Sequence, residues 1–167
     1  QALGALPDRL NWRLIHIGGG PLKDELLAQA QEIGVADRIE WRGKQDQTEV
    51  IAALRSADLF VLPSKIAGDG DRDGLPNVLM EAASQKLPIL STAVSAIPEF
   101  IEDGVHGRLT PPGDPVAFSE ALSEMISTVT KRTCYADAAY VRLRQEFGMR
   151  GGIDVLEVLL RGALGRG

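Results

Sequence analysis

Two acidic side chains, Asp73 and Glu81, flank the start of one predicted helix. The helix is expected from about Leu75 to Gln85, because Pro76 suits a first turn and apolar residues follow at helical spacing. Eight helical steps rise about 12 Å, so both carboxylates can flank one elongated ligand. Carboxylates accept hydrogen bonds from vicinal hydroxyls, and a helix start attracts phosphate. The pattern favours a nucleotide sugar, with ribose at Glu81, diphosphate at the helix start and sugar hydroxyls at Asp73.

A simpler interpretation of the same segment needs no ligand. Asp73 would then only favour the helix start electrostatically, and Glu81 would face solvent. The apolar helix face formed by Leu79, Ala82 and Ala83 favours ligand binding instead, because Glu81 lies beside that face rather than opposite it. A carboxylate at the edge of a buried sheet needs a partner, and a ligand can supply one.

Several other kinds of chemistry lack the residues that they require. The turn Gly18–Pro21 has no third glycine at the spacing of dinucleotide-binding turns, because Lys23 stands there, so we interpret it as a tight turn. Ser64 lacks the Gly-x-Ser-x-Gly surroundings of a hydrolase nucleophile. Cys134 is the single cysteine and the chain has two histidines, so we expect neither a disulfide nor a metal site. His106 precedes a glycine in a turn and is expected to be structural.

The composition is that of a globular domain. The 167 residues are 44% hydrophobic and 25% charged, with a formal net charge of −5. This acidic balance argues against a nucleic-acid partner. No apolar run reaches the roughly 20 residues that cross a bilayer. The first residues form no signal peptide and include no Met, so we expect a cytoplasmic domain of a larger protein.

Short apolar segments alternate with amphipathic ones along the chain. The sequence predicts strands at 12–17, 38–42, 58–62, 87–91 and 107–110, and helices at 22–33, 47–57, 75–85, 96–102, 115–128 and, with a break at Gly148, 131–164. Thr48 and Asp114 are the expected caps of the helices that follow them. The alternation indicates an α/β fold, a Rossmann-like parallel sheet with helices on both faces. We expect one domain over 1–167, with C-terminal helices in 131–167, and ligands at the carboxyl ends of the strands.

Five motifs occur together in one order. They are the strand and turn Leu14–Pro21, the strand Ile39–Gly43, and the segments Ser56–Ser64, Asp73–Glu81 and Pro98–Leu109. Over about residues 9 to 128, the chain resembles the C-terminal, donor-binding domain of the group 1 (family 4) retaining glycosyltransferases. The segment Asp73–Glu81 resembles their E-G-x-P-x-x-x-x-E motif. The resemblance implies the GT-B fold, in which two Rossmann-like domains face a cleft.

The resemblance also implies an activity and its site. The full enzyme would transfer a hexose from a nucleoside diphosphate sugar to a glycan or lipid-linked acceptor hydroxyl with retention, and would need no metal or other cofactor. Asp73 and Glu81 would be the catalytic residues. The implied nucleotide-sugar-binding residues are Gly43, Lys44, Ser64, Arg72, Gly74, Leu75, Pro76, Asn77 and Glu81. The acceptor would meet another domain, and the full-length protein is expected in the cytoplasm, peripheral to the membrane surface.

Departures from the family pattern keep two alternatives open. Asp73 replaces the usual glutamate, Ala96 replaces the usual glycine, and Ala67–Arg72 lengthens the preceding loop. The alternatives are one half of a nucleotide-sugar 2-epimerase and a nucleotide-binding domain without turnover.

A further departure concerns the first strand of the family's domain. No counterpart of that strand, or of its basic residues, precedes Asn11. It would lie in the sheet between the strands at 13–17 and 59–62. We therefore expect the chain alone to be catalytically inactive.

Overall fold

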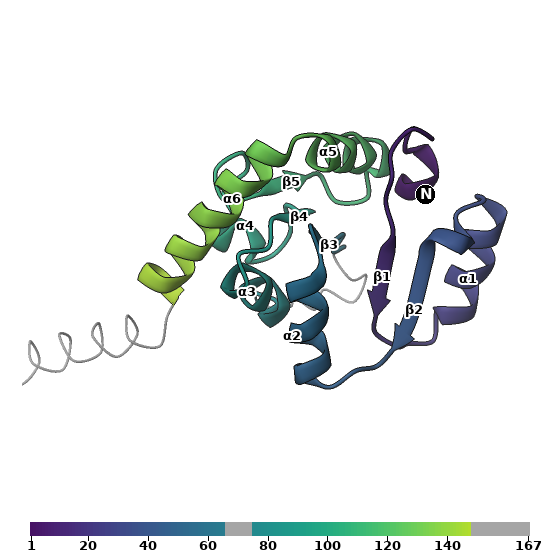
Figure 1. The fold of residues 1–167 in the computed structure, drawn as a ribbon, viewed down its shortest axis with the longest axis horizontal. Coiled ribbons are helices and arrows are strands. Elements are labelled where there is room, and N and C mark those ends of the chain that lie inside the picture. Colours follow the sequence, from purple (N-terminus) through teal and green to yellow (C-terminus); the bar gives the residue numbers. More distant parts are fainter. Residues whose placement is uncertain (66–74, 148–167) are drawn as a thin grey trace, which may run out of the picture.

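The computed structural model describes residues 1–65 and 75–147 of the chain. Strands and helices alternate through them as predicted (Figure 1). In chain order the elements are η1 (Ala2–Ala5), β1 (Leu14–Ile17), α1 (Lys23–Glu32), η2 (Ala36–Arg38), β2 (Ile39–Gly43), α2 (Gln47–Ser56), β3 (Phe60–Leu62), α3 (Asn77–Ser84), β4 (Ile89–Thr92), α4 (Ile97–Phe100), β5 (Arg108–Thr110), α5 (Pro115–Ser127), α6 (Val129–Arg142) and η3 (Leu143–Phe147).

The described strands form two parallel sheets. β1 pairs with β2, and β4 lies between β3 and β5. The break falls between β1 and β3, the place predicted for the family's additional strand. The two sheets are adjacent (Figure 1), because Trp12, just before β1, packs in the same apolar cluster as Val61 of β3. The described sheets are therefore the two sides of one Rossmann-like arrangement.

Helices cover both faces of the three-stranded sheet. On one face, Leu79 of α3 and Phe100 of α4 pack with Ile89 of β4, and all three side chains are fully buried. On the other face, Phe118 of α5 packs with Leu90 of β4. Ile89 and Leu90 are consecutive, so their side chains point to opposite faces of the strand. The predicted α/β fold is confirmed, and the core lies around β4.

Burial differs between the strands of this sheet. Every residue of β4 is buried because it is the central strand. Every residue of β3 is partly exposed. Its side chains still pack on both faces, because Phe60 and Leu62 contact the cluster around Ile89 while Val61 contacts the cluster around Leu90, as predicted for a sheet with helices on both faces.

Side-chain caps fix the starts of two helices. Asp114 accepts hydrogen bonds from two backbone N–H groups of α5, at 2.9 and 3.0 Å, as predicted. The start of α2 differs from the prediction, because Asp46 caps it by accepting a backbone N–H bond at 2.9 Å. Thr48 already lies inside this helix and is not its cap.

The chain continues from α5 into α6 and then into the single π-helical turn η3. This agrees with the first of the helices predicted for 131–164. The break predicted at Gly148 and the helix predicted after it lie outside the described residues. Among the described helices, none has the length and apolar character needed to cross a bilayer.

Candidate functional site

Helix α3 begins at Asn77, two residues later than predicted. Pro76 is the residue that caps it, with extended backbone angles of −62° and 124°, and its carbonyl accepts a hydrogen bond from the N–H of Leu79 at 3.0 Å. The N–H groups at the helix start are therefore those of Asn77 and Val78. Leu75 precedes the helix, and its predicted contact with the diphosphate stays a prediction.

The later start also places Glu81 close to the beginning of α3. Glu81 lies four residues after Asn77, which is about one helical turn or 6 Å of rise. The distance expected between Asp73 and Glu81 stays a prediction, because the structure does not describe Asp73. Arg72, Asp73 and Gly74 lie outside the described residues. Their roles at the sugar and the diphosphate stay predictions.

The Glu81 side chain lies on the partly exposed side of α3 and forms a hydrogen bond to another helix. Glu81 is partly exposed beside three buried neighbours, Leu79, Ala82 and Ala83, as predicted. Its Oε1 accepts a hydrogen bond from Nε2 of Gln47, the first residue of α2, at 3.3 Å. Sequence reasoning assigned no role to Gln47, which lies 34 positions away. The sequence offered one signal for Gln47, because this residue begins a helix directly after the turn that follows a strand.

The turns that follow β1 and β2 meet at the carboxyl ends of these strands. The N–H of Gly18 donates to the carbonyl of Gly43 at 2.8 Å. Gly43 has a φ of +68°, a left-handed conformation that favours glycine. A Cβ at Gly19 would lie 3.1 Å from Cγ of Lys44, so the lysine side chain passes closely over this turn. Gly43 and Lys44 thus lie at the predicted edge of the sheet.

Buried hydroxyls hold the carboxyl ends of β3 and β4 together. Oγ of Ser91 donates to the carbonyl of Leu62 at 2.7 Å, and Oγ1 of Thr92 donates to the carbonyl of Ser64 at 2.6 Å. Both donors are at most 3% exposed, so these bonds are shielded from water. Ser64 is therefore fixed at the carboxyl end of β3.

The predicted site residues that the structure describes all lie at strand ends or around α3. Through Gln47, the structure brings Glu81 together with the helix that follows β2. The α3 start suits an anionic group, and Glu81 suits hydroxyl groups. Across residues 1–65 and 75–147, no three His, Cys, Asp or Glu side chains gather as metal ligands. The described members are Gly43, Lys44, Ser64, Leu75, Pro76, Asn77 and Glu81.

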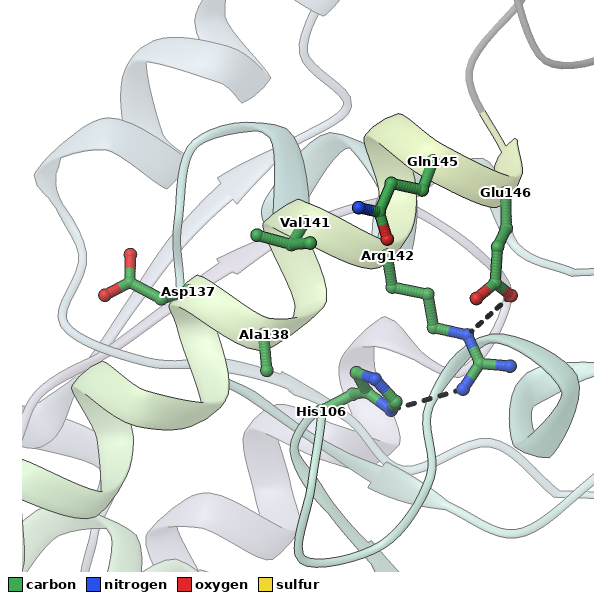
Figure 2. Close-up of a pocket in the computed structure, with 7 residues that line it drawn as sticks. All are labelled: His106, Asp137, Ala138, Val141, Arg142, Gln145 and Glu146. Carbon is green, nitrogen blue, oxygen red and sulfur yellow. Dashed lines mark hydrogen bonds and ion pairs between the residues drawn. The ribbon is translucent and has the colours of Figure 1, made fainter.

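A shallow hollow of about 370 Å³ lies elsewhere, along α6 and η3 (Figure 2). There Nδ1 of His106 is 3.2 Å from Nη1 of Arg142. Nη2 of Arg142 donates to the carbonyl of Glu99 at 3.0 Å, and its Nε pairs with Glu146 at 3.1 Å. The arginine joins the helix to the turn through these bonds, in agreement with the structural role predicted for His106.

The surroundings of His106 predict a pH dependence of stability. Burial, followed by the charge of Arg142, lowers the pKa of His106 below its usual value. The unfolded chain therefore binds this proton more readily than the folded chain. Stability should be full above the usual pKa of about 6.5 and fall as the pH drops through that value toward the lowered pKa. Urea unfolding across this pH range should show a decrease in the free energy of unfolding of the wild-type chain and not of His106→Gln. An equal decrease in both would contradict the assignment of this pH dependence to His106.

Comparison with known proteins identifies the family. Residues 1–128 match the family model described as glycosyl transferases group 1. The chain belongs to this family, as the resemblance of its motifs indicated. The chain was predicted to be the C-terminal domain of such a protein, and a solved C-terminal domain of this family has a similar fold.

Two curated relatives and two solved structures illustrate the match. The putative colanic acid biosynthesis glycosyltransferase WcaL of Salmonella typhimurium is 40% identical over 108 residues, which are 65% of this chain and 27% of the relative. The amylovoran biosynthesis glycosyltransferase AmsK of Erwinia amylovora is 36% identical over 131 residues, 78% of this chain and 32% of the relative. The chain thus spans about a third of the length of these relatives.

The solved structures share the fold. Anabaena HepE in complex with UDP-glucose superposes with a TM-score of 0.79 at 22% identity, covering 95% of this chain and 43% of HepE. The C-terminal domain of the group 1 glycosyl transferase LpcC of Francisella tularensis superposes with a TM-score of 0.71 at 24% identity, covering 83% of this chain and 71% of that one. These likenesses support the GT-B fold.

Proposed function

We propose that this chain binds the nucleoside diphosphate sugar of a retaining hexosyltransferase. The full protein would transfer the sugar to a hydroxyl of a glycan or a lipid-linked acceptor. The observation that carries the proposal is the position of Glu81, one turn beyond the start of α3 and tied to the helix that follows β2. Such a position lets one ligand contact both the helix start and the carboxylate.

The proposed contacts follow from the charge of each group. Glu81 accepts hydrogen bonds from the ribose hydroxyls, and the N–H groups of Asn77 and Val78 meet the diphosphate. Negative charge grows on the diphosphate as the sugar leaves, and the partial positive charge of the helix start stabilises it. Asp73 binds the donor sugar, and the turn that begins at Gly43 borders the base.

The remaining predicted residues complete the donor site. Lys44 and Arg72 supply positive charge toward the diphosphate, the backbone N–H groups of Gly74 and Leu75 contact it, and Ser64 and Pro76 border it. No metal takes part, because the helix start and the basic side chains provide the positive charge. The location proposed for the full protein is the cytoplasm, peripheral to the membrane.

The named relatives favour transfer over the two alternatives. WcaL and AmsK are both glycosyltransferases by name, which supports transfer rather than 2-epimerisation or binding without turnover. Transfer also needs an acceptor site, and this chain spans only 27% of WcaL and 32% of AmsK. We therefore propose that the 167-residue chain binds donor without turning it over. Full transferase activity of this chain alone would contradict that part.

Calorimetric titration with UDP, GDP and ADP tests the proposed binding. UDP is the first ligand to try, because the similar HepE structure contains UDP-glucose. We expect one of the three to bind, and its monophosphate to bind about tenfold more weakly, because the second phosphate adds charge at the helix start. A metal chelator should leave the affinity unchanged. Absence of binding for all three nucleotides, or its loss with the chelator, would refute the proposal.

A further inference from the structure

One polar contact joins two helices that are far apart in sequence. Nε2 of Gln47 on α2 donates to Oε1 of Glu81 on α3 at 3.3 Å. The amide also sits at the end of α2 that follows the turn after β2. This is the side of the molecule where a ligand of Glu81 would lie.

The helix that carries Gln47 is held in place independently. The cap formed by Asp46 fixes the first turn of α2 through a hydrogen bond of 2.9 Å. Farther along α2, Nε of Arg55 donates to Oε1 of Gln85, the residue directly after α3, at 2.8 Å. Leu54 of α2 is buried in the same apolar cluster as α3. These contacts hold the backbone of α2 beside α3, from which the exposed Gln47 side chain reaches Glu81.

A neutral amide donor suits the task of orienting a carboxylate. An ionised carboxylate offers about four acceptor sites on its two oxygens. Gln47 occupies one site on Oε1 and so restrains the plane of the group while the other oxygen stays available. A lysine or arginine there would neutralise the charge, whereas an amide leaves the negative charge for the ligand.

We propose that Gln47 is a positioning residue that orients the Glu81 carboxylate toward the vicinal hydroxyls of a ribose. This inference rests on the proposed function of the site. Gln47 would then be a second residue, besides Glu81, that determines the preference for a ribonucleotide over its 2′-deoxy form. Gln47 acts through Glu81 and makes no contact with the ligand in this proposal.

The test compares the affinity of the chain for UDP and for 2′-deoxy-UDP, or for the corresponding pair if another base binds. The wild-type chain should prefer the ribonucleotide about tenfold or more, because each hydroxyl bonds to a charged group. Gln47→Ala should reduce this ratio to about two- or threefold while the affinity for the deoxy form changes little. Gln47→Glu should lower the affinity for both ligands further, because a second carboxylate repels Glu81 and the diphosphate.

Gln85→Ala is the matched control. It removes the exposed hydrogen bond from Arg55 of α2 to the residue that ends α3, together with a bond to Ser84, and neither involves the Glu81 carboxylate. It should keep the wild-type preference for the ribonucleotide. An unchanged preference in Gln47→Ala, or an equal loss in Gln85→Ala, would overturn the inference.

These outcomes separate the inference from the proposed function. If Glu81→Ala abolishes the preference and Gln47→Ala does not, the ribose site stands and only the role of Gln47 is wrong. If the wild-type chain binds neither nucleotide, or binds both equally, the proposed ribose contact fails and the inference fails with it.

Discussion

Replacing Leu79 by alanine should destabilise the folded chain by about 3 to 5 kcal/mol. The Leu79 side chain is fully buried and packs with Ile89 and Phe100 in the core around β4. Shortening it removes buried methyl groups and leaves a cavity that the surrounding helices and strand can fill only in part. Urea unfolding followed by circular dichroism would measure the change as a lower midpoint.

The same deletion at an exposed position provides the control. Leu22 is 59% exposed, so Leu22→Ala should change the free energy of unfolding by less than about 0.5 kcal/mol. Equal shifts in the two variants would mean that α3 is not anchored in the core as described. The anchoring of α3 in the core matters for function, because α3 also carries Glu81 of the candidate site.

Replacing Glu81 by alanine should weaken nucleoside diphosphate binding about 100-fold, or about 2.7 kcal/mol. The variant loses the proposed charged hydrogen bonds to the two ribose hydroxyls. Glu81 is partly exposed at the helix rim, so its removal should leave the fold intact. Calorimetric titration measures the affinity, and unfolding of the same sample shows that the variant is folded.

Glu120→Ala tests whether the charge alone matters. Glu120 is an exposed acid on α5, and its removal changes the net charge by the same amount. Its affinity for the nucleotide should equal that of the wild-type chain. If Glu81→Ala binds as tightly as Glu120→Ala, Glu81 does not contact the ribose.

Local patterns in the sequence suffice for the order of the elements. Apolar or alternating runs next to glycine or proline predict each described strand, and the acid directly before Pro115 predicts the cap of α5. These features depend on neighbours within a few residues.

Features that depend on tertiary structure differ from the prediction. The choice of Asp46 over Thr48 as the cap of α2 depends on where the preceding turn delivers the chain. The start of α3 depends on Pro76, whose extended backbone ends the loop rather than begins the helix.

The contact between Gln47 and Glu81 shows the same limit at the site. Each residue lies on an amphipathic helix with many polar neighbours, and 34 positions separate the two. Only the packing of α2 against α3 selects this pair. The sequence therefore predicts the acid of the candidate site but not the side chain that restrains it.

A crystal structure of the chain with a bound nucleoside diphosphate tests the central claim most directly. We expect the ribose hydroxyls to lie within hydrogen-bond distance of the Glu81 carboxylate and the phosphates to lie against the first N–H groups of α3. A nucleotide bound at another surface, with the Glu81 carboxylate still facing water, would contradict the claim.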